Sequence, residues 1–195
     1  MRVLVLYCHP VEESFGASLH KEVVSSLTEA GHEVDDCDLY AEGFNPIMSR
    51  EDRLNYHTVP ENLDLMGIRE HVERLRAADG IVIVSPIWNF GWPAMLKGYF
   101  DKVWVPGVTF DLVDGKLQSK LFNIQKLISI NTYGADPFRA FLAGNPPGKI
   151  IHRVFRATIK PGATIKQLKH WSMDRSTDAS RKKFLARVRR EMERF

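Results

Sequence analysis

The chain opens on Val3-Leu4-Val5-Leu6-Tyr7, an apolar run with the length of a buried parallel strand. Cys8-His9-Pro10 ends this run, and the polar loop Val11-Glu12-Glu13-Ser14-Phe15-Gly16-Ala17-Ser18 then leads into a helical pattern. A strand, a tight loop and a helix N-terminus make a corner that suits a phosphate, because first-turn amides lack partners and carry partial positive charge. The serines of this loop add hydroxyl donors, and its glycine lets a bulky anion approach the backbone. The alternative is an ordinary strand-to-helix connection capped by Ser14.

The composition is that of an ordinary globular protein, with 195 residues, 44% hydrophobic and 26% charged residues, and a net charge of +3. Basic residues gather from Arg181 to Arg194 at helical spacing, which indicates a solvated helix face rather than a nucleic-acid surface. Cys8 and Cys37 form neither a disulfide framework nor a metal quartet. No apolar run has the length of a membrane span, and no signal-peptide layout is present. We expect one domain, residues 1–195, in the cytoplasm, without membrane insertion, nucleic-acid partner or metal.

Five strand candidates alternate with helical patterns along the chain. The strands are expected at residues 3–7, 32–39, 80–85, 126–131 and 163–170, and Pro86 is expected to end the third. Helices are expected after Ser14 up to Gly31, around residues 68–75, from near Pro93, and at residues 150–159 and 177–193. Residues 40–63 and 106–115 are expected to form loops, and residues 136–147 a mobile lid. This alternation predicts an α/β three-layer sandwich, a five-stranded parallel sheet in the order 2-1-3-4-5 with helices on both faces and the charged second strand at an edge.

In such sheets, ligands bind beyond the carboxyl ends of the strands, where the strand order reverses. Three strand exits look unlike packing segments, and we expect them to converge on one crevice: 9–18, 86–92 and 132–134. The second exit is the most informative, because Ser85-Pro86-Ile87-Trp88-Asn89-Phe90-Gly91-Trp92-Pro93 combines three aromatic rings with one amide side chain. Such a loop offers the walls and backbone amides that a flat apolar ring requires. For any single one of these aromatics, the competing interpretation as core over the sheet end is favoured.

Other chemistries have little support. The chain has no G-x-G-x-x-G, no Walker loop and no G-x-S-x-G elbow, and its histidines lack metal spacing. The first and third strand ends carry no carboxylate, which excludes a phosphate-receiver domain. Cys8 lies beside the predicted phosphate corner, where a thiol can have a lowered pKa, but a small buried residue is the favoured interpretation.

The chain resembles the flavodoxin-like NAD(P)H:quinone reductases, the DT-diaphorase group with its bacterial relatives. The matching segments are Val3–His9, Ser14–Ser18, Asp38-Leu39-Tyr40, Phe44-Asn45-Pro46 and, most specific of all, Pro86–Val103. The resemblance implies a noncovalent flavin, FAD or alternatively FMN, reduced by NAD(P)H through hydride transfer to its N5. A quinone or a similar aromatic acceptor then replaces the nicotinamide in a ping-pong cycle. It also implies a homodimer in which the partner chain completes each active site, with the loop Phe110-Asp111-Leu112-Val113 as a candidate contributor.

By position, the resemblance assigns the flavin-binding residues in three groups. The phosphates would be surrounded by His9, Ser14, Phe15, Gly16 and Ser18; the isoalloxazine would be lined by Pro86, Ile87, Trp88, Asn89 and Phe90; its other edge would be closed by Thr132, Tyr133 and Gly134. Tyr133 departs from the family, which often has glycine there, and we expect it to sit over the ring or to narrow the pocket. No residue matches the family's proton-moving Tyr and His securely, so no catalytic acid or base is assigned. The competing function is a flavin-bearing accessory subunit or electron carrier, although carriers of this fold are usually strongly acidic.

Overall fold

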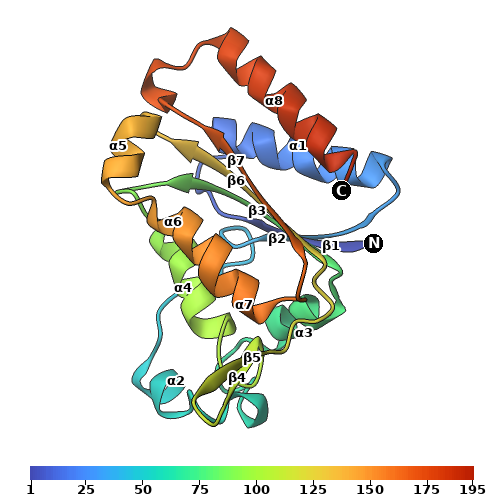
Figure 1. Ribbon diagram of the computed structural model, residues 1–195, viewed down its shortest axis with the longest axis vertical. Coiled ribbons are helices and arrows are strands. Elements are labelled where there is room, and N and C mark those ends of the chain that lie inside the picture. Colours follow the sequence, from blue (N-terminus) through green and yellow to red (C-terminus); the bar gives the residue numbers. More distant parts are fainter.

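The computed structural model describes all residues from 1 to 195 and places a parallel sheet between two layers of helices (Figure 1). The order β2-β1-β3-β6-β7 confirms the predicted topology, because β6 and β7 are the fourth and fifth strands of this sheet along the chain. The charged strand β2 lies at an edge, as predicted. The strands are β1 (Arg2–Tyr7), β2 (Glu33–Asp38), β3 (Gly80–Ile87), β6 (Lys126–Tyr133) and β7 (Thr164–His170).

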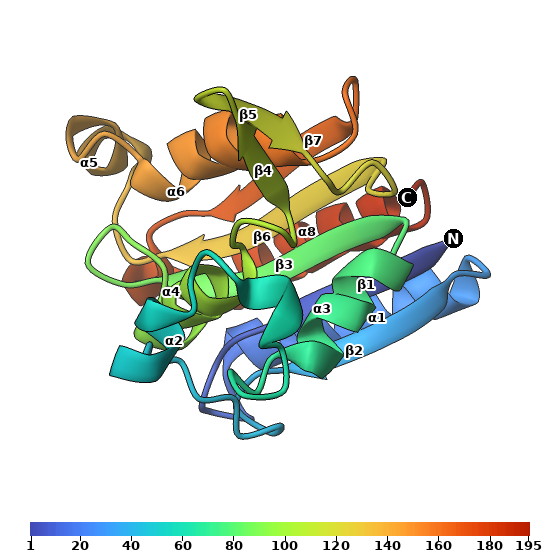
Figure 2. The same cartoon turned by 90° about the horizontal axis from the view of Figure 1, so that it is seen from below.

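Successive residues of β1 face opposite sides of the sheet, so one apolar strand supplies two cores. Val3 and Val5 pack into the core beneath α1 (Phe15–Glu29) and α8 (Asp178–Met192). Leu4 and Leu6 join the larger core beneath α3 (Arg69–Ala77) and α4 (Ala94–Val103). Figure 1 and Figure 2 show these two helix pairs on opposite faces of the sheet. Burial on both faces explains why β1 is a continuous apolar run.

Strand β3 continues through Pro86 to Ile87, so the prediction that Pro86 ends it is wrong. The Val84 carbonyl accepts from the Cys8 amide at 3.1 Å, which shows that Val84 faces β1. Pro86 lies two residues further on and therefore faces the same side, where β1 has already ended. The missing amide hydrogen of Pro86 thus removes no sheet hydrogen bond.

The segments predicted as loops contain regular structure. Residues 110–119 form a hairpin of β4 (Phe110–Val113) and β5 (Lys116–Ser119), with Asp114 and Gly115 at positive φ in its turn. Residues 40–63 include the short helices α2 (Arg50–Leu54) and η1 (Val59–Glu61). Ser49 is the N-cap residue of α2, and its side chain forms a capping box with Asp52.

The proposed lid contains two short helices, α5 (Pro137–Leu142) and α6 (Pro146–Lys149), because Pro137 and Pro146 occupy first-turn positions that suit proline. Its mobility stays a prediction. The helical prediction for residues 150–159 is confirmed by η2 (Ile150–Phe155) and α7 (Arg156–Thr158), and the chain also has η3 (Met173–Arg175). None of the helices combines the length and the apolar character that crossing a bilayer demands.

Candidate functional site

A cleft of about 270 Å³ lies at the carboxyl ends of the central strands. The three strand-exit segments predicted to converge all contribute to it, together with η3, which follows β7. Its lining consists of His9, Ser14, Phe15, Gly16, Pro86, Ile87, Trp88, Thr132, Gly134, Met173 and Asp174. The cleft therefore lies at the switch point of the sheet, where β1 and β3 diverge toward their different neighbours.

The N-terminus of α1 opens into this cleft. Ser14 is the N-cap residue, and its Oγ accepts the Ala17 amide at 3.0 Å, as the capping alternative predicted. The amides of Phe15 and Gly16, both in the cleft lining, have no hydrogen-bond acceptor within the chain. Two free donors and the positive end of the helix dipole thus face the same space, which makes it suitable for an anion.

His9 adds a third donor to this end of the cleft. The Val11 amide donates to His9 Nδ1 at 3.0 Å, so the neutral ring carries its proton on Nε2. Burial lowers the pKa of His9, which favours the neutral form at pH 7. The ring packs edge-on against Trp88, with 6.0 Å between ring centroids. His9 therefore offers a fixed, uncharged N–H donor.

A tight two-residue turn follows β3 beside the cleft. Trp88 and Gly91 exchange both backbone hydrogen bonds, each 2.9 Å long, and enclose Asn89 and Phe90 at φ of 48° and 61°. Two consecutive left-handed residues define a type I′ turn. Asn tolerates this conformation, whereas an aromatic residue rarely adopts it. The strained Phe90 marks this turn as a segment that the surrounding structure holds in place.

The three aromatic residues of this loop differ in burial. Trp88 is 44% exposed and Phe90 is 39% exposed, so the interpretation as core is wrong for both. Trp92 is half-buried and packs against Phe100 and Phe155, with ring-centroid distances of 4.9 and 5.8 Å. Trp92 thus anchors the loop to the core, and Trp88 and Phe90 remain available at the surface.

Some predicted site residues do not line the cleft. Ser18 is exposed on α1, and its hydroxyl is directed back to the Ser14 carbonyl at 3.5 Å. Asn89 and Phe90 lie at the turn tip beside the cleft rather than in its lining. The largest departure is Tyr133, whose side chain is 2% exposed.

The expectation that Tyr133 covers or narrows the pocket is wrong. Its ring packs with Ile87 and with Trp171, and its hydroxyl donates to Asn145 Oδ1 at 3.0 Å. Side chains alternate along β6, and because Thr132 and Gly134 line the cleft, Tyr133 must point away from it. Burial raises the pKa of Tyr133 to about 12, so this phenol stays neutral.

Two residues of the cleft lining were not predicted from the sequence: Met173 and Asp174 in η3. A β-carbon at Gly134 would lie 3.4 Å from Asp174 Oδ2, so the carboxylate stands close to the β6 exit. The rule that ligands bind beyond the carboxyl ends of parallel strands identifies this segment too, because η3 follows the carboxyl end of β7. No lysine or arginine is among the lining residues.

Cys8 lies near the cleft but is not part of its lining. The side chain is fully buried, and burial raises the pKa of its thiol to about 12. The interpretation as a small buried residue is therefore confirmed, and burial disfavours the thiolate form at this position.

Comparison with known proteins gives consistent matches. A family model described as flavodoxin-like fold matches residues 1–164. An uncharacterized NAD(P)H oxidoreductase of Haemophilus influenzae is 33% identical over 146 residues, covering 72% of this chain and 69% of that protein. The NAD(P)H dehydrogenase [quinone] 1 of Rattus norvegicus is 30% identical over 148 residues, covering 69% of this chain and 54% of that protein.

The solved structure of an NAD(P)H:quinone oxidoreductase from Methanothermobacter marburgensis superposes with a TM-score of 0.81 at 25% identity, covering 99% of this chain and 96% of that one. The chain spans about half the length of several curated relatives that it matches. The family match extends over the whole region that builds β1, β3, β6 and most of the cleft. The chain therefore belongs to the flavodoxin-like NAD(P)H:quinone oxidoreductase family.

Proposed function

We propose that the cleft binds a flavin, FAD or FMN, without a covalent bond, and that the protein is an NAD(P)H dehydrogenase acting on quinones or similar flat aromatic acceptors. The observation that carries this proposal is the meeting of a helix N-terminus and an aromatic-walled loop in one cleft. A molecule with an anionic tail and a flat ring matches both ends of such a cleft. The names of the relatives agree with this chemistry.

The residues at the α1 end fit a phosphate group. The free amides of Phe15 and Gly16 and the Nε2–H of His9 would donate to its oxygens. The Ser14 hydroxyl hydrogen is also available, because Ser14 Oγ acts as an acceptor within the chain. Binding would therefore rest on oriented neutral donors and the helix dipole, without a charged side chain.

The residues at the other end fit an aromatic ring system. Pro86, Ile87 and Trp88 would form one wall, and Thr132 and Gly134 the opposite edge. The amides of Asn89 and Phe90 at the turn tip have no acceptor within the chain and would donate to ring heteroatoms. The rigid type I′ turn would hold these donors in place, which limits the entropy lost on binding.

When bound, the flavin supplies two-electron chemistry, accepting hydride from NAD(P)H and passing both electrons to the acceptor. The chain positions the reactants and shields them from water, and its neutral His9 leaves the anion site without a titrating cation at pH 7. In this proposal the donor and the acceptor use the same exposed face in turn. The half-exposed Trp88 and Phe90 would stack beside that face.

We also propose a homodimer, because large apolar side chains are exposed on α5, which follows β6, and on the β4–β5 hairpin. Phe138 and Phe141 on α5 are 68% and 75% exposed, and Leu112 on β4 is 62% exposed. Exposed apolar side chains of this size are typical of surfaces that a partner covers. Light scattering of the purified protein tests this assembly.

The visible spectrum of the purified protein, followed by chromatography of the released cofactor, tests the flavin proposal. Menadione-dependent oxidation of NAD(P)H then tests the activity; co-purification with a transport partner without such turnover would favour the accessory-subunit function. Phe90→Asp should abolish flavin retention while the circular dichroism spectrum stays unchanged. Phe122→Asp is the matched control, because Phe122 is 59% exposed and precedes β6, at the amino-terminal ends of the strands and away from the cleft. Unchanged flavin occupancy in Phe90→Asp would refute the placement of the ring.

A further inference from the structure

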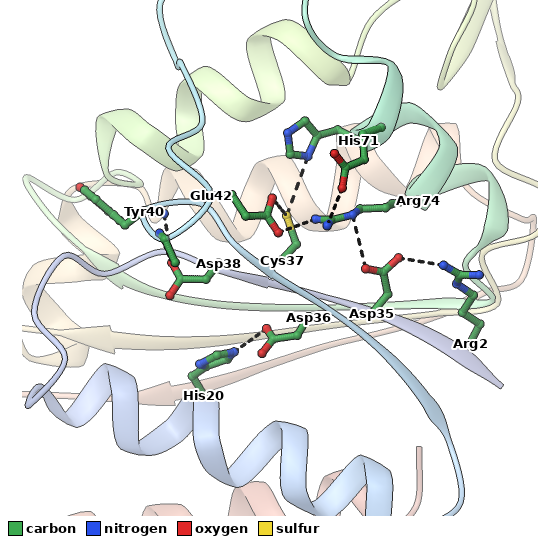
Figure 3. A network of polar contacts seen from close by, with 12 residues as sticks. Arg2, His20, Asp35, Asp36, Cys37, Asp38, Tyr40, Glu42, His71 and Arg74 are labelled. Carbon is green, nitrogen blue, oxygen red and sulfur yellow. Dashed lines mark hydrogen bonds and ion pairs between the residues drawn. The ribbon is translucent and has the colours of Figure 1, made fainter.

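A second cluster of chemically active side chains lies at the β2 edge of the sheet, outside the cleft (Figure 3). Cys37 lies in β2, Glu42 in the turn that follows this strand, and His71 on α3. Cys37 is fully buried and His71 is 8% exposed, whereas Glu42 reaches solvent. Two segments distant from one another in the sequence, β2 with its following turn and α3, thus bring a thiol, a carboxylate and an imidazole together.

The spacing of these three groups matches a tetrahedral metal site. Cys37 Sγ lies 3.5 Å from Glu42 Oε2 and 3.9 Å from His71 Nδ1, and the three ligand atoms all lie within 4.8 Å of one another. Ligand atoms around tetrahedral Zn²⁺ are separated by roughly 3.3–3.8 Å, given bonds of about 2.0–2.3 Å. Shifts of less than about 1 Å would therefore close the site around one ion.

His71 is held in the position that a metal ligand requires. Its Nδ1 lies 3.9 Å from Cys37 Sγ, so a ring nitrogen faces the thiol. The ring is held edge-on between Phe44 and Tyr99, with centroid distances of 4.9 and 5.4 Å. A histidine fixed by its neighbours loses little freedom when it coordinates.

The two carboxylate oxygens of Glu42 contact different groups. Arg74 donates to Oε1 at 2.7 Å, which leaves Oε2 directed toward the Cys37 thiol. Arg74 also pairs with Asp35 at 3.4 Å and Glu70 at 2.8 Å, and Arg2 pairs with Asp35 at 3.2 Å, so three carboxylates face two guanidinium groups around the cluster. This surplus negative charge favours a bound cation, and Arg74 acts as the group that orients Glu42.

An independent observation comes from Tyr99. Its hydroxyl is buried and has no hydrogen-bond partner. The Tyr99 ring packs against the His71 ring, with 5.4 Å between the ring centroids, so Tyr99 borders the cluster. Buried hydroxyls are normally satisfied, and a metal-bound water would supply the missing partner.

We propose that Cys37, Glu42 and His71 bind one Zn²⁺ ion, with a water molecule as the fourth ligand within reach of Tyr99. On binding, the S–H bond of Cys37 breaks, its proton passes to solvent, and a sulfur–zinc bond forms without any change of oxidation state. Sulfur, imidazole and one carboxylate suit Zn²⁺ rather than Mg²⁺ or Ca²⁺. The ion ties β2 and its following turn to α3 and has a structural role.

Cobalt(II) titration of the untagged, EDTA-treated protein tests this proposal. One equivalent of Co²⁺ should produce thiolate-to-cobalt charge-transfer absorption and the intense visible bands of tetrahedral cobalt, which added Zn²⁺ removes. Difference spectra taken before and after addition cancel the absorption of any bound flavin. The charge-transfer band should disappear in Cys37→Ala and persist in Cys8→Ala, the matched control at the other buried thiol.

Glu42→Gln is a second variant, chosen because this side chain reaches solvent and glutamine keeps its shape. We expect its Co²⁺ affinity to fall at least about tenfold, with the charge-transfer band retained at saturation. No band at stoichiometric Co²⁺, a band that survives in Cys37→Ala, or unchanged affinity in Glu42→Gln would overturn the proposal. Cobalt binding without thiolate absorption would place the ion elsewhere and overturn it equally.

Discussion

Comparing glycine with alanine at position 90 gives the sharpest test of the turn that follows β3. Phe90 has φ of 61°, in the left-handed region. A β-carbon in that region costs about 1–2 kcal/mol, whereas glycine adopts it without this cost. Both Phe90→Gly and Phe90→Ala remove the aromatic ring, so their difference isolates the backbone conformation.

The expected difference has an unusual sign. Glycine is ordinarily less stable than alanine by roughly 0.5–1 kcal/mol, because it loses more backbone freedom on folding. Subtracting the midpoint of this term, about 0.75 kcal/mol, from the midpoint of the left-handed cost, about 1.5 kcal/mol, leaves Phe90→Gly more stable than Phe90→Ala by about 0.75 kcal/mol. For a domain of this size, that corresponds to a difference of about 1.5–3 °C in Tm.

Thermal unfolding of the flavin-free proteins measures this difference, since a bound ligand would add its own contribution to Tm. Flavin retention, measured separately, should fall in both variants because both lose the ring. A Phe90→Ala variant as stable as Phe90→Gly, or more stable, would refute the left-handed turn and the rigid platform argued from it.

Three further predictions concern the packing that supports the sheet. Gly98→Ala should lower the free energy of unfolding by about 1–3 kcal/mol, because its β-carbon would lie 2.3 Å from the Pro46 carbonyl oxygen. Urea titration measures this loss, and an unchanged midpoint would contradict the close approach of α4 to Pro46. Lys102→Met should lower the free energy of unfolding by about 3–5 kcal/mol, because it leaves the buried Asp52 carboxylate, 3.3 Å from the Lys102 ammonium, without its partner. Adding Asp52→Asn should recover part of this loss. Burial lowers the pKa of His71, so the unfolded state takes up a proton at a higher pH than the folded state does. The free energy of unfolding should therefore fall as the pH drops below about 6.5, and it should fall less steeply in His71→Gln. Equal slopes of this free energy against pH in the two proteins would argue against a neutral buried ring.

The sheet was predictable because its strands carry local signals that tertiary structure does not override. Residues 3–7 and 80–84 are apolar throughout, which indicates strands covered on both faces. The acids of residues 33–38 indicate an edge. Given five such strands with intervening helices, few topologies remain, and the strand-end rule then brings distant loops to one cleft.

The errors concern the ends of two strands and one short hairpin. Pro86 is tolerated within β3 because β1 stops before it, a fact that no local signal at Pro86 reveals. Tyr133 points away from the cleft because β6 continues two residues beyond its apolar run and keeps its alternation. The β4–β5 hairpin did have a local signal, Asp114-Gly115, but its short, exposed strands lack the apolar alternation that usually accompanies it.

The turn at residues 88–91 shows how a local preference is overridden at the candidate site. Propensity alone would place Gly91 in a left-handed position, yet Asn89 and Phe90 occupy both left-handed positions and Gly91 pairs with Trp88 instead. Moving the turn by one residue would turn Trp92 away from Phe100 and remove its packing against the core. The buried anchor therefore fixes the register, and the strain falls on Phe90, at the tip beside the cleft. Strain retained at an exposed aromatic contributes nothing to the core, which is why we connect it with ligand binding.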